Sequence, residues 1–451
     1  MLVRTDSGQV RGDSEGVFRG IPFAAPPEGP LRFAPPAPPE SWDGVRDCTS
    51  FGSAPPQLAP APGAPPAWRP GDGLDCLTLN VWTPDLGAAG LPVMVWIYGG
   101  QWKYGATRMP QYDAATLAAS GVVVVTVNYR VGFEGFGHLP GVADNRGVRD
   151  QIAALEWVQR NIAAFGGAPG NVTVFGQSAG AASIALLLGT AAAKGLFRRA
   201  IAQSIPSGYR STAEAEAVTA AIAAAAGVPA TRDGFAALAP EAILAVQDVT
   251  EGVSSFSPVI DGDLVTGPPW SARLDPDVDL ICGFTHDEYL GHGPVPNADL
   301  SAVAAAIGLP PDAATAYRAF TGDPIVAMLS DALIRMPTTW VAEAHAGGRT
   351  WLYDFTWRGP TVGAAHGIDI PFTFGNPTTR FATRFLGTPP PVSFGPLSEE
   401  IRRAWTTFAT TGDPGWPQFT DHHQTRIWDT EPSVATDPLA ASRAIWQDVG
   451  H

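Results

Sequence analysis

The stretch VFGQSAG, residues 174–180, places a serine between two glycines, directly after an apolar run and directly before the small-residue segment AASIALLLG. A strand that turns sharply into a helix forces its turning residue into an unfavourable backbone conformation. Bulky side chains two positions away on either side would clash with the neighbouring strand and helix, and glycine at both positions removes that clash. The G-x-S-x-G pattern therefore predicts a strand–turn–helix unit that exposes the Oγ of Ser178 as a nucleophile.

The segments around this turn predict the sheet that carries it. Continuous apolar runs rich in β-branched residues are typical of parallel strands that are covered on both faces. Residues 113–120 and 144–167 have the composition and spacing of helices, and the second segment stops at a pair of glycines. The alternation of strands and helices predicts an α/β fold with a doubly wound, mostly parallel sheet. The expected strands are 92–98, 122–129, 171–175, 198–204, 278–284 and 350–356.

Two Ala-rich helical stretches, roughly residues 205–250 and 298–346, interrupt the alternation. They are too long for simple crossovers between strands. We expect them to lie as a cap over the carboxyl ends of the strands, where this architecture places its ligand site.

Composition and charge narrow the class of protein. The chain has 451 residues, of which 45% are hydrophobic and 16% charged, with a formal net charge of −15. This composition is that of a folded globular protein, and the negative charge argues against a nucleic-acid partner. No apolar run approaches membrane-spanning length, and residues 1–10 lack the pattern of a secretory signal. We therefore expect a cytoplasmic protein, unless a leader has been removed.

A serine nucleophile needs a histidine base and a carboxylate that orients the base. Of the eight histidines, His366 stands out because it lies in the small-residue loop GAAHGIDIPFTFG after the strand expected at 350–356. The segment GFTHDEY offers Asp287 and Glu288 as the acid, and spacing does not choose between them. The chain order nucleophile, acid, base is that of α/β-hydrolases.

A metal site is the alternative use of this acidic segment. His286 stands next to the two carboxylates, but adjacent residues point apart and no partner histidine lies at ligand spacing. The three cysteines, Cys48, Cys76 and Cys282, also lack metal-ligand spacing, and at least one thiol must be free. The sequence therefore predicts neither a metal nor another cofactor.

Motifs along nearly the whole chain carry a family resemblance. In order they are FRGIPFAAPPEGPLRF (18–33), DCLTLNVWTP (75–84), VNYRVGFEGF (127–136), NVTVFGQSAG (171–180), FSPVIDG (256–262), GAAHGIDIPFTFG (363–375) and WTTFATTGDP (405–414). The chain resembles the type-B carboxylesterase family, which includes cholinesterases and bacterial para-nitrobenzyl esterases. The resemblance implies that residues 1–451 form a single α/β-hydrolase catalytic domain.

The resemblance also implies roles for individual residues. Ser178 matches the family's nucleophile, Glu288 its triad acid and His366 its base. Ser204 matches a serine that steadies the acid and the histidine in that family. The family's oxyanion hole is built from a glycine-rich stretch and the residue after the nucleophile, which correspond here to the N–H groups of Gly100, Gln101 and Ala179.

Two departures from the family pattern concern the site. Gln101 replaces a third glycine, and its side chain either projects toward the substrate pocket or folds back onto the protein. Gln177 replaces the glutamate that usually precedes the nucleophile, which removes a carboxylate beside His366 and makes a preference for cationic substrates less expected.

Other departures concern structure. Leu74 stands where the family has an acidic residue, so we expect Arg32 to lack its usual partner. Proline replaces the first cysteine of the family's disulfide, which leaves a bridge between Cys48 and Cys76 open. Trp68 is out of register with the cation-binding tryptophan of cholinesterases, and we interpret it as a loop anchor.

The sequence therefore predicts a serine hydrolase that cleaves a small-molecule carboxylic ester through an acyl-enzyme. An acyl-transfer or cyclisation enzyme with the same triad is an alternative that no sequence feature separates from a hydrolase. A non-catalytic binding protein of the same fold is a further alternative. It predicts a damaged triad, whereas all three triad residues are present here.

Overall fold

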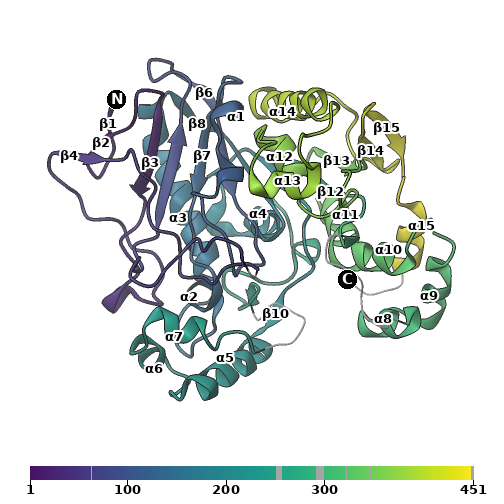
Figure 1. The fold of residues 1–451 in the computed structure, drawn as a ribbon, viewed down its shortest axis with the longest axis horizontal. Helices are drawn as coiled ribbons and strands as arrows, with labels where there is room; N and C mark the ends of the chain where they lie inside the picture. Colours follow the sequence, from purple (N-terminus) through teal and green to yellow (C-terminus); the bar gives the residue numbers. More distant parts are fainter. Residues whose placement is uncertain (62, 250–255, 291–298, 321, 346, 448–451) are drawn as a thin grey trace.

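The computed structural model describes residues 1–61, 63–249, 256–290, 299–320, 322–345 and 347–447 (Figure 1). Within them, ten strands form one sheet in the order β15-β14-β13-β12-β9-β8-β6-β7-β5-β3. Neighbouring strands from β14 to β7 are parallel, whereas β15, β5 and β3 pair antiparallel at the two edges. The strands are β3 (Val17–Pro22), β5 (Thr78–Trp82), β6 (Leu91–Ile97), β7 (Val123–Val127), β8 (Gly167–Gln177), β9 (Arg199–Gln203), β12 (Asp279–Thr285), β13 (Thr350–Phe355), β14 (Gln424–Trp428) and β15 (Ser433–Thr436).

The six strands expected from the apolar runs correspond to β6, β7, β8, β9, β12 and β13, so the prediction of a mostly parallel α/β sheet is confirmed. Their residues are almost all buried, as strands covered on both faces must be. The smaller sheets, which the sequence did not predict, lie outside this core. They are β1 (Leu2–Arg4) with β2 (Gln9–Arg11) and β4 (Val45–Asp47), and β10 (Arg210–Ser211) with β11 (Val259–Ile260).

Helices cover both faces of the large sheet. On one face Trp96 of β6 and Phe175 of β8 pack against Phe374 of α12, and Trp351 of β13 packs against Phe408 of α14. On the other face lie α3, α4 and α11. The helices of these two layers, with α1 and α2, are α1 (Ala115–Ala118), α2 (Gly132–Phe136), α3 (Arg146–Asn161), α4 (Ala179–Gly189), α11 (Met336–Ala344), α12 (Asp369–Phe374), α13 (Arg380–Leu386) and α14 (Phe394–Thr411).

The remaining helices form two groups that stand apart from each other in Figure 1. The first group lies in the stretch 205–250 and the second in 298–346, but α11, at the end of the second stretch, packs on β12 and β13 as a crossover helix. The first group contains α5 (Thr212–Ala226), α6 (Arg232–Ala236) and α7 (Pro240–Leu244), and the second contains α8 (Leu300–Ala306), α9 (Pro311–Tyr317) and α10 (Pro324–Ser330). The last helix, α15 (Ala440–Trp446), belongs to neither group and contacts α11.

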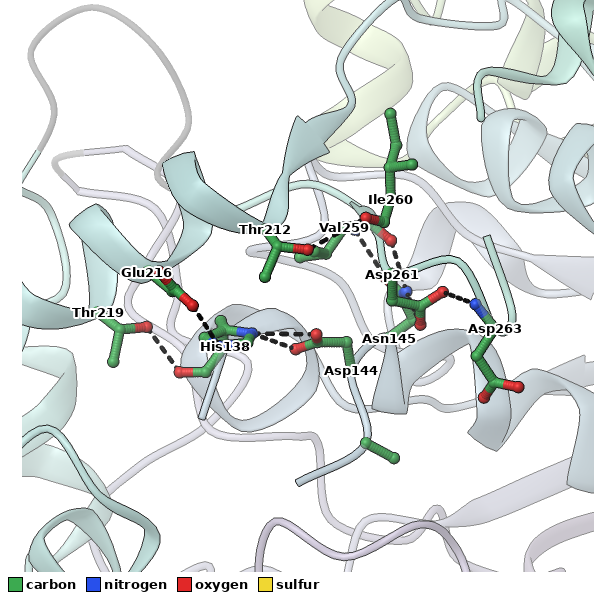
Figure 2. Close-up of polar contacts among 12 residues, drawn as sticks. His138, Asp144, Asn145, Thr212, Glu216, Thr219, Val259, Ile260, Asp261 and Asp263 are labelled. Carbon is green, nitrogen blue, oxygen red and sulfur yellow. Dashed lines mark hydrogen bonds and ion pairs between the residues drawn. The ribbon is translucent and has the colours of Figure 1, made fainter. Parts of the chain in front are cut away.

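The first group is attached to loops that follow the carboxyl ends of β6 and β7. Figure 2 shows His138, in the loop between α2 and α3, with Nδ1 at 3.0 and 3.1 Å from the two carboxylate oxygens of Asp144. From α5, Thr219 donates a 2.7 Å hydrogen bond to the carbonyl of His138, and Glu216 lies 3.8 Å from its Nε2. Lys103, after β6, forms an ion pair with Asp248. That these helices cap the site remains a prediction.

Arg32 has a partner other than the residue at position 74, which is the replacement that the sequence did not predict. Its Nη2 lies 2.6 Å from Oε1 of Glu134 in α2, and both side chains are buried. Nη1 also donates to the carbonyl of Leu238. The carboxylate of Glu134, 102 positions further along the chain, thus pairs with Arg32, whereas Leu74 has no charge to offer it. The ion pair between Arg32 and Glu134 therefore links two segments that are far apart in the sequence.

The cysteines and Trp68 behave as packing residues. Cys48, Cys76 and Cys282 are all free and buried, so the open Cys48–Cys76 bridge is absent. Burial raises the pKa of the Cys48 thiol to about 11, which keeps it protonated and unreactive near neutral pH. Trp68 is 4% exposed and donates from Nε1 to the carbonyl of Gly73 at 3.0 Å, as expected of a loop anchor.

Candidate active site

Ser178 occupies a strained turn between β8 and α4. Its φ of 57° and ψ of −124° belong to a region that residues with a side chain rarely adopt. A Cβ atom on Gly180 would lie 2.0 Å from the carbonyl oxygen of Ile97, and a Cβ atom on Gly176 would lie 2.5 Å from the same oxygen. Both glycines are therefore required by the neighbouring strand β6, as the G-x-S-x-G pattern predicts.

Glu288 lies in the turn that follows β12 and is 2% exposed. Its Oε1 accepts a 2.8 Å hydrogen bond from the N–H of Thr285, and its Oε2 contacts Nδ1 of His366. Asp287 points elsewhere, because its carboxylate forms an ion pair with Arg358 at 2.8 Å. Of the two acids that spacing left open, Glu288 is therefore the one that contacts the histidine.

His366 lies in the loop between β13 and α12, and its N–H donates to the carbonyl of Glu288 at 3.3 Å. Burial disfavours the charged imidazole, but the charge and hydrogen bond of Glu288 outweigh burial, so the pKa of His366 is raised. Nε2 lies 3.0 Å from the amide nitrogen of Gln177. Because Nδ1 faces a carboxylate, Nε2 is the nitrogen that carries the lone pair and accepts from this amide.

The Gln177 contact brings His366 to the turn at Ser178, since Gln177 directly precedes Ser178. The side chain of His366 is 22% exposed and Ser178 is partly exposed, so both are accessible to a small molecule. The elements that carry the three residues end at the carboxyl edge of the sheet, where β8, β12 and β13 are parallel. Residues 178, 288 and 366 are therefore gathered at this edge by sheet topology.

The loop after β6 lies against the nucleophile turn. A Cβ atom on Gly99 would lie 2.9 Å from Cβ of Ser178 and 2.4 Å from the carbonyl oxygen of Gln177. Gly100 and Gln101 both have positive φ, at 127° and 57°, and the side chain of Gln101 is exposed.

The backbone N–H groups expected to form the oxyanion hole belong to this loop and to the start of α4. Ala179 is the first residue of α4, where an N–H group has no partner within the helix. In the part of the chain that the structure describes, the N–H groups of Gly100 and Ala179 donate to no other group. They are therefore available to an oxygen of a bound substrate.

Two further residues bear on the site. Ser204 follows β9 and is buried, and its Oγ makes no hydrogen bond to any described residue, so its role in steadying Glu288 or His366 stays a prediction. Asp369, which the sequence reading missed, is buried in α12 and accepts a 2.7 Å hydrogen bond from Gln203. Burial raises its pKa to about 6. A carboxylate three residues after His366, on a mostly apolar helix, was the available signal.

Over the described ranges, no group of three or more His, Cys, Asp or Glu side chains is arranged to hold a metal ion. Within the same ranges, no helix combines the length and apolar character that crossing a membrane requires.

Comparison with known proteins places this geometry in context. The profile of the carboxylesterase family matches residues 1–306 and 310–443. The chain is 36% identical to a para-nitrobenzyl esterase of Bacillus subtilis, over 98% of this chain and 97% of that protein. It is 35% identical to a phenmedipham hydrolase of Pseudarthrobacter oxydans, over 95% of this chain and 92% of that protein.

Solved structures agree with the sequence comparisons. A carboxylesterase of Geobacillus stearothermophilus superimposes with a TM-score of 0.88 at 34% identity, covering 99% of this chain and 100% of that chain. A PNB esterase superimposes with a TM-score of 0.90 at 35% identity, covering 99% of each chain. The α/β-hydrolase fold of these structures is thus also the fold of this chain.

Proposed function

Because the chain belongs to the carboxylesterase family and is a carboxylic ester hydrolase, we propose that it cleaves small or medium esters through an acyl-enzyme on Ser178. His366 serves as the base and Glu288 as the acid that orients it. The observation that carries the proposal is the contact of Glu288 with Nδ1 of His366, which leaves Nε2 as the proton acceptor at the nucleophile turn.

The proposed reaction uses each of these groups in turn. Nε2 of His366 takes the proton of Ser178 as Oγ attacks the ester carbonyl, and the buried carboxylate of Glu288 stabilises the resulting imidazolium. The imidazolium then gives its proton to the leaving alcohol, and the acyl group stays on Ser178. Water attacks the acyl-enzyme with His366 again as base, which releases the carboxylic acid.

The negative charge that develops on the carbonyl oxygen requires donors. We assign this role to the N–H groups of Gly100, Gln101 and Ala179, which are backbone groups and so tolerate the change from glycine to glutamine. Loss of one such donor typically lowers the rate by about 10²–10³-fold. The strained conformation of Ser178 supports this assignment, because it holds the following N–H at the start of a helix.

Substrate size is the second part of the proposal. Gln101 belongs to the loop that lies against Ser178 and is exposed, and we propose that its side chain narrows the pocket or offers an amide to the substrate. Gln177 is neutral, so no carboxylate stands at that position to attract a cationic substrate. We therefore expect a preference for neutral esters with acyl groups of modest size.

The test is hydrolysis of para-nitrophenyl esters from acetyl to octanoyl by the purified protein and by Ser178→Ala. Turnover that depends on Ser178 and shows a chain-length optimum would support the proposal. Gln101→Gly, assayed in parallel, should widen the range of accepted acyl groups.

Product analysis in the presence of an added alcohol separates hydrolysis from acyl transfer. Free acid as the main product indicates hydrolysis, whereas a new ester of the added alcohol indicates a transferase. Equal turnover by the folded wild type and Ser178→Ala would refute the nucleophile. Absence of turnover by a folded wild type on every ester would favour a specialised acyl-transfer enzyme or a site obstructed by Gln101.

A further inference from the structure

The connection between α10 and α11 is a single turn of π-helix over Asp331–Arg335, closed by a hydrogen bond from the N–H of Met336 to the carbonyl of Asp331. In an α-helix each residue advances the helix by about 100°, so residues five apart point about 140° away from each other. A π turn is closed by bonds between residues five apart, which brings such residues onto the same side. Here it aligns Ser330 with Arg335.

Both of these side chains reach the turn that carries Glu288. Ser330 Oγ accepts a 3.1 Å hydrogen bond from the N–H of Tyr289, and Nη1 of Arg335 donates to the carbonyl of His286 at 3.1 Å. Tyr289 and His286 stand on either side of residues 287 and 288. The π turn therefore contacts the acid-bearing turn at two points that flank Glu288.

The opposite side of the same turn is held by strand β13 and the histidine loop. The N–H of His286 donates to the carbonyl of Phe355 at 2.9 Å, and the N–H of Asp287 donates to the carbonyl of Ala364 at 3.0 Å. The turn is thus fixed between the His366 loop on one side and the π turn on the other. A shift of the π turn would change the position of Glu288 relative to His366.

Arg335 is itself held rigidly. Its Nε donates to Asp331 at 2.7 Å, its Nη2 donates to the carbonyl of Ala327 at 3.1 Å, and the side chain is 5% exposed. Asp331 in turn accepts a 2.6 Å hydrogen bond from Tyr317, which accepts a 2.7 Å hydrogen bond from Trp446. A buried ion pair often adds little stability over apolar residues of the same size. The ion pair between Asp331 and Arg335 instead fixes the direction in which the Arg335 side chain points.

We propose that Ser330 and Arg335 are positioning residues that act through the backbone of residues 286–289 to hold Glu288 against His366, and that the π turn exists to align them. The proposal rests on the proposed function, in which Glu288 is the triad acid. It concerns geometry and predicts a loss of kcat with little change in KM, because neither residue is expected to touch substrate.

The test compares Arg335→Met, Arg335→Lys, Ser330→Ala and removal of Leu333, with Leu333→Ala as the matched control. Leu333 lies in the π turn and is 39% exposed. Its removal shortens the turn by one residue, which is expected to restore a regular helix and rotate Arg335 away. Leu333→Ala keeps the π turn. Misplacement of a catalytic group by about 1 Å costs up to about 10²-fold in rate. We therefore expect kcat to fall about 10- to 100-fold in Arg335→Met and in the deletion.

A spectroscopic readout separates positioning from general loss of stability. The proton between Nδ1 of His366 and Glu288 should give a downfield ¹H NMR resonance, which should shift or disappear in Arg335→Met and in the deletion. It should remain in Leu333→Ala, and Arg335→Lys should recover part of both the resonance and kcat. Melting temperatures and circular dichroism establish that each variant is folded at the assay temperature.

Folded Arg335→Met and Ser330→Ala with wild-type kcat and an unchanged resonance would overturn the proposal. If Arg335→Met or the deletion does not fold, Ser330→Ala and Arg335→Lys decide by the same readouts. Glu288→Gln is measured alongside. If it loses activity while the Arg335 and Ser330 variants keep theirs, only the positioning role fails. If it keeps full activity, the triad assignment fails and the positioning role with it.

Discussion

Replacing Gly180 by alanine should damage both the stability and the activity of the protein. The new Cβ would lie 2.0 Å from the carbonyl oxygen of Ile97 and 2.8 Å from that of Tyr98, whereas such contacts are essentially never shorter than 3.0 Å. The start of α4, with Ser178, must therefore move away from β6 by about 1 Å. Overpacking of this kind typically costs about 1–3 kcal/mol. A displacement of about 1 Å at a nucleophile can lower the rate by about 10²-fold.

Helix propensity alone predicts the opposite sign, since alanine is favoured over glycine in a helix by up to about 1 kcal/mol. Gly395 provides the matched control, because it is also the second residue of its helix, α14, and a Cβ there would meet nothing within 4 Å. We expect Gly395→Ala to be neutral or stabilising with normal kcat. The assays are urea unfolding and kcat/KM on a para-nitrophenyl ester. Equal stability and activity of Gly180→Ala and Gly395→Ala would refute the steric account of the nucleophile turn.

Four further substitutions test the electrostatics of the site. Glu288→Gln should lower kcat far more than Asp287→Asn, because Asp287 pairs with Arg358 on the surface, and the reverse ranking would mean that the wrong acid was chosen. Gln177→Glu would place a carboxylate beside Nε2 of His366 and raise the pKa of His366 further. Because only neutral histidine acts as base, the acidic limb of the kcat/KM profile should move to higher pH. An acidic limb at the wild-type pH would contradict this. Asp369 has a folded-state pKa of about 6, above its usual 3.8, so its contribution to stability is present below pH 3.8 and is lost as pH rises through 6, a difference of about 3 kcal/mol. Asp369→Asn should therefore gain stability over wild type in urea unfolding as the pH rises from 4 to 7, levelling off above the folded-state pKa, and a gain that does not grow over this range would contradict the shifted pKa.

The turn at Ser178 was predictable because its requirements are local. Gly176, Ser178 and Gly180 lie within five residues, and the steric conflict that demands glycine arises wherever a strand turns into a helix next to another strand. His366 was also recognisable, because its loop follows a clear strand. What the sequence did not predict are contacts between residues far apart in the chain. Arg32 pairs with Glu134, which no local pattern connects to it.

The π turn shows a different limit. Five residues are too few for an apolar pattern to distinguish a period of 3.6 from a wider turn, so residues 331–335 read as ordinary helix. Asp369 was overlooked for a related reason, because its buried environment, rather than its position in the motif, makes it unusual.

The sequence by itself determined the class of fold, and it predicted a nucleophile and the chain order of the three proposed triad residues. Apolar runs and glycine spacing express short-range sterics and burial, which are properties of neighbouring residues. The tertiary structure decided which acid contacts His366, that Gln177 reaches Nε2, and which buried groups surround the site. These contacts join positions up to 189 residues apart. Parallel strands bring their carboxyl ends to one edge of the sheet, and the direction in which each side chain leaves that edge depends on the packing of every element around it.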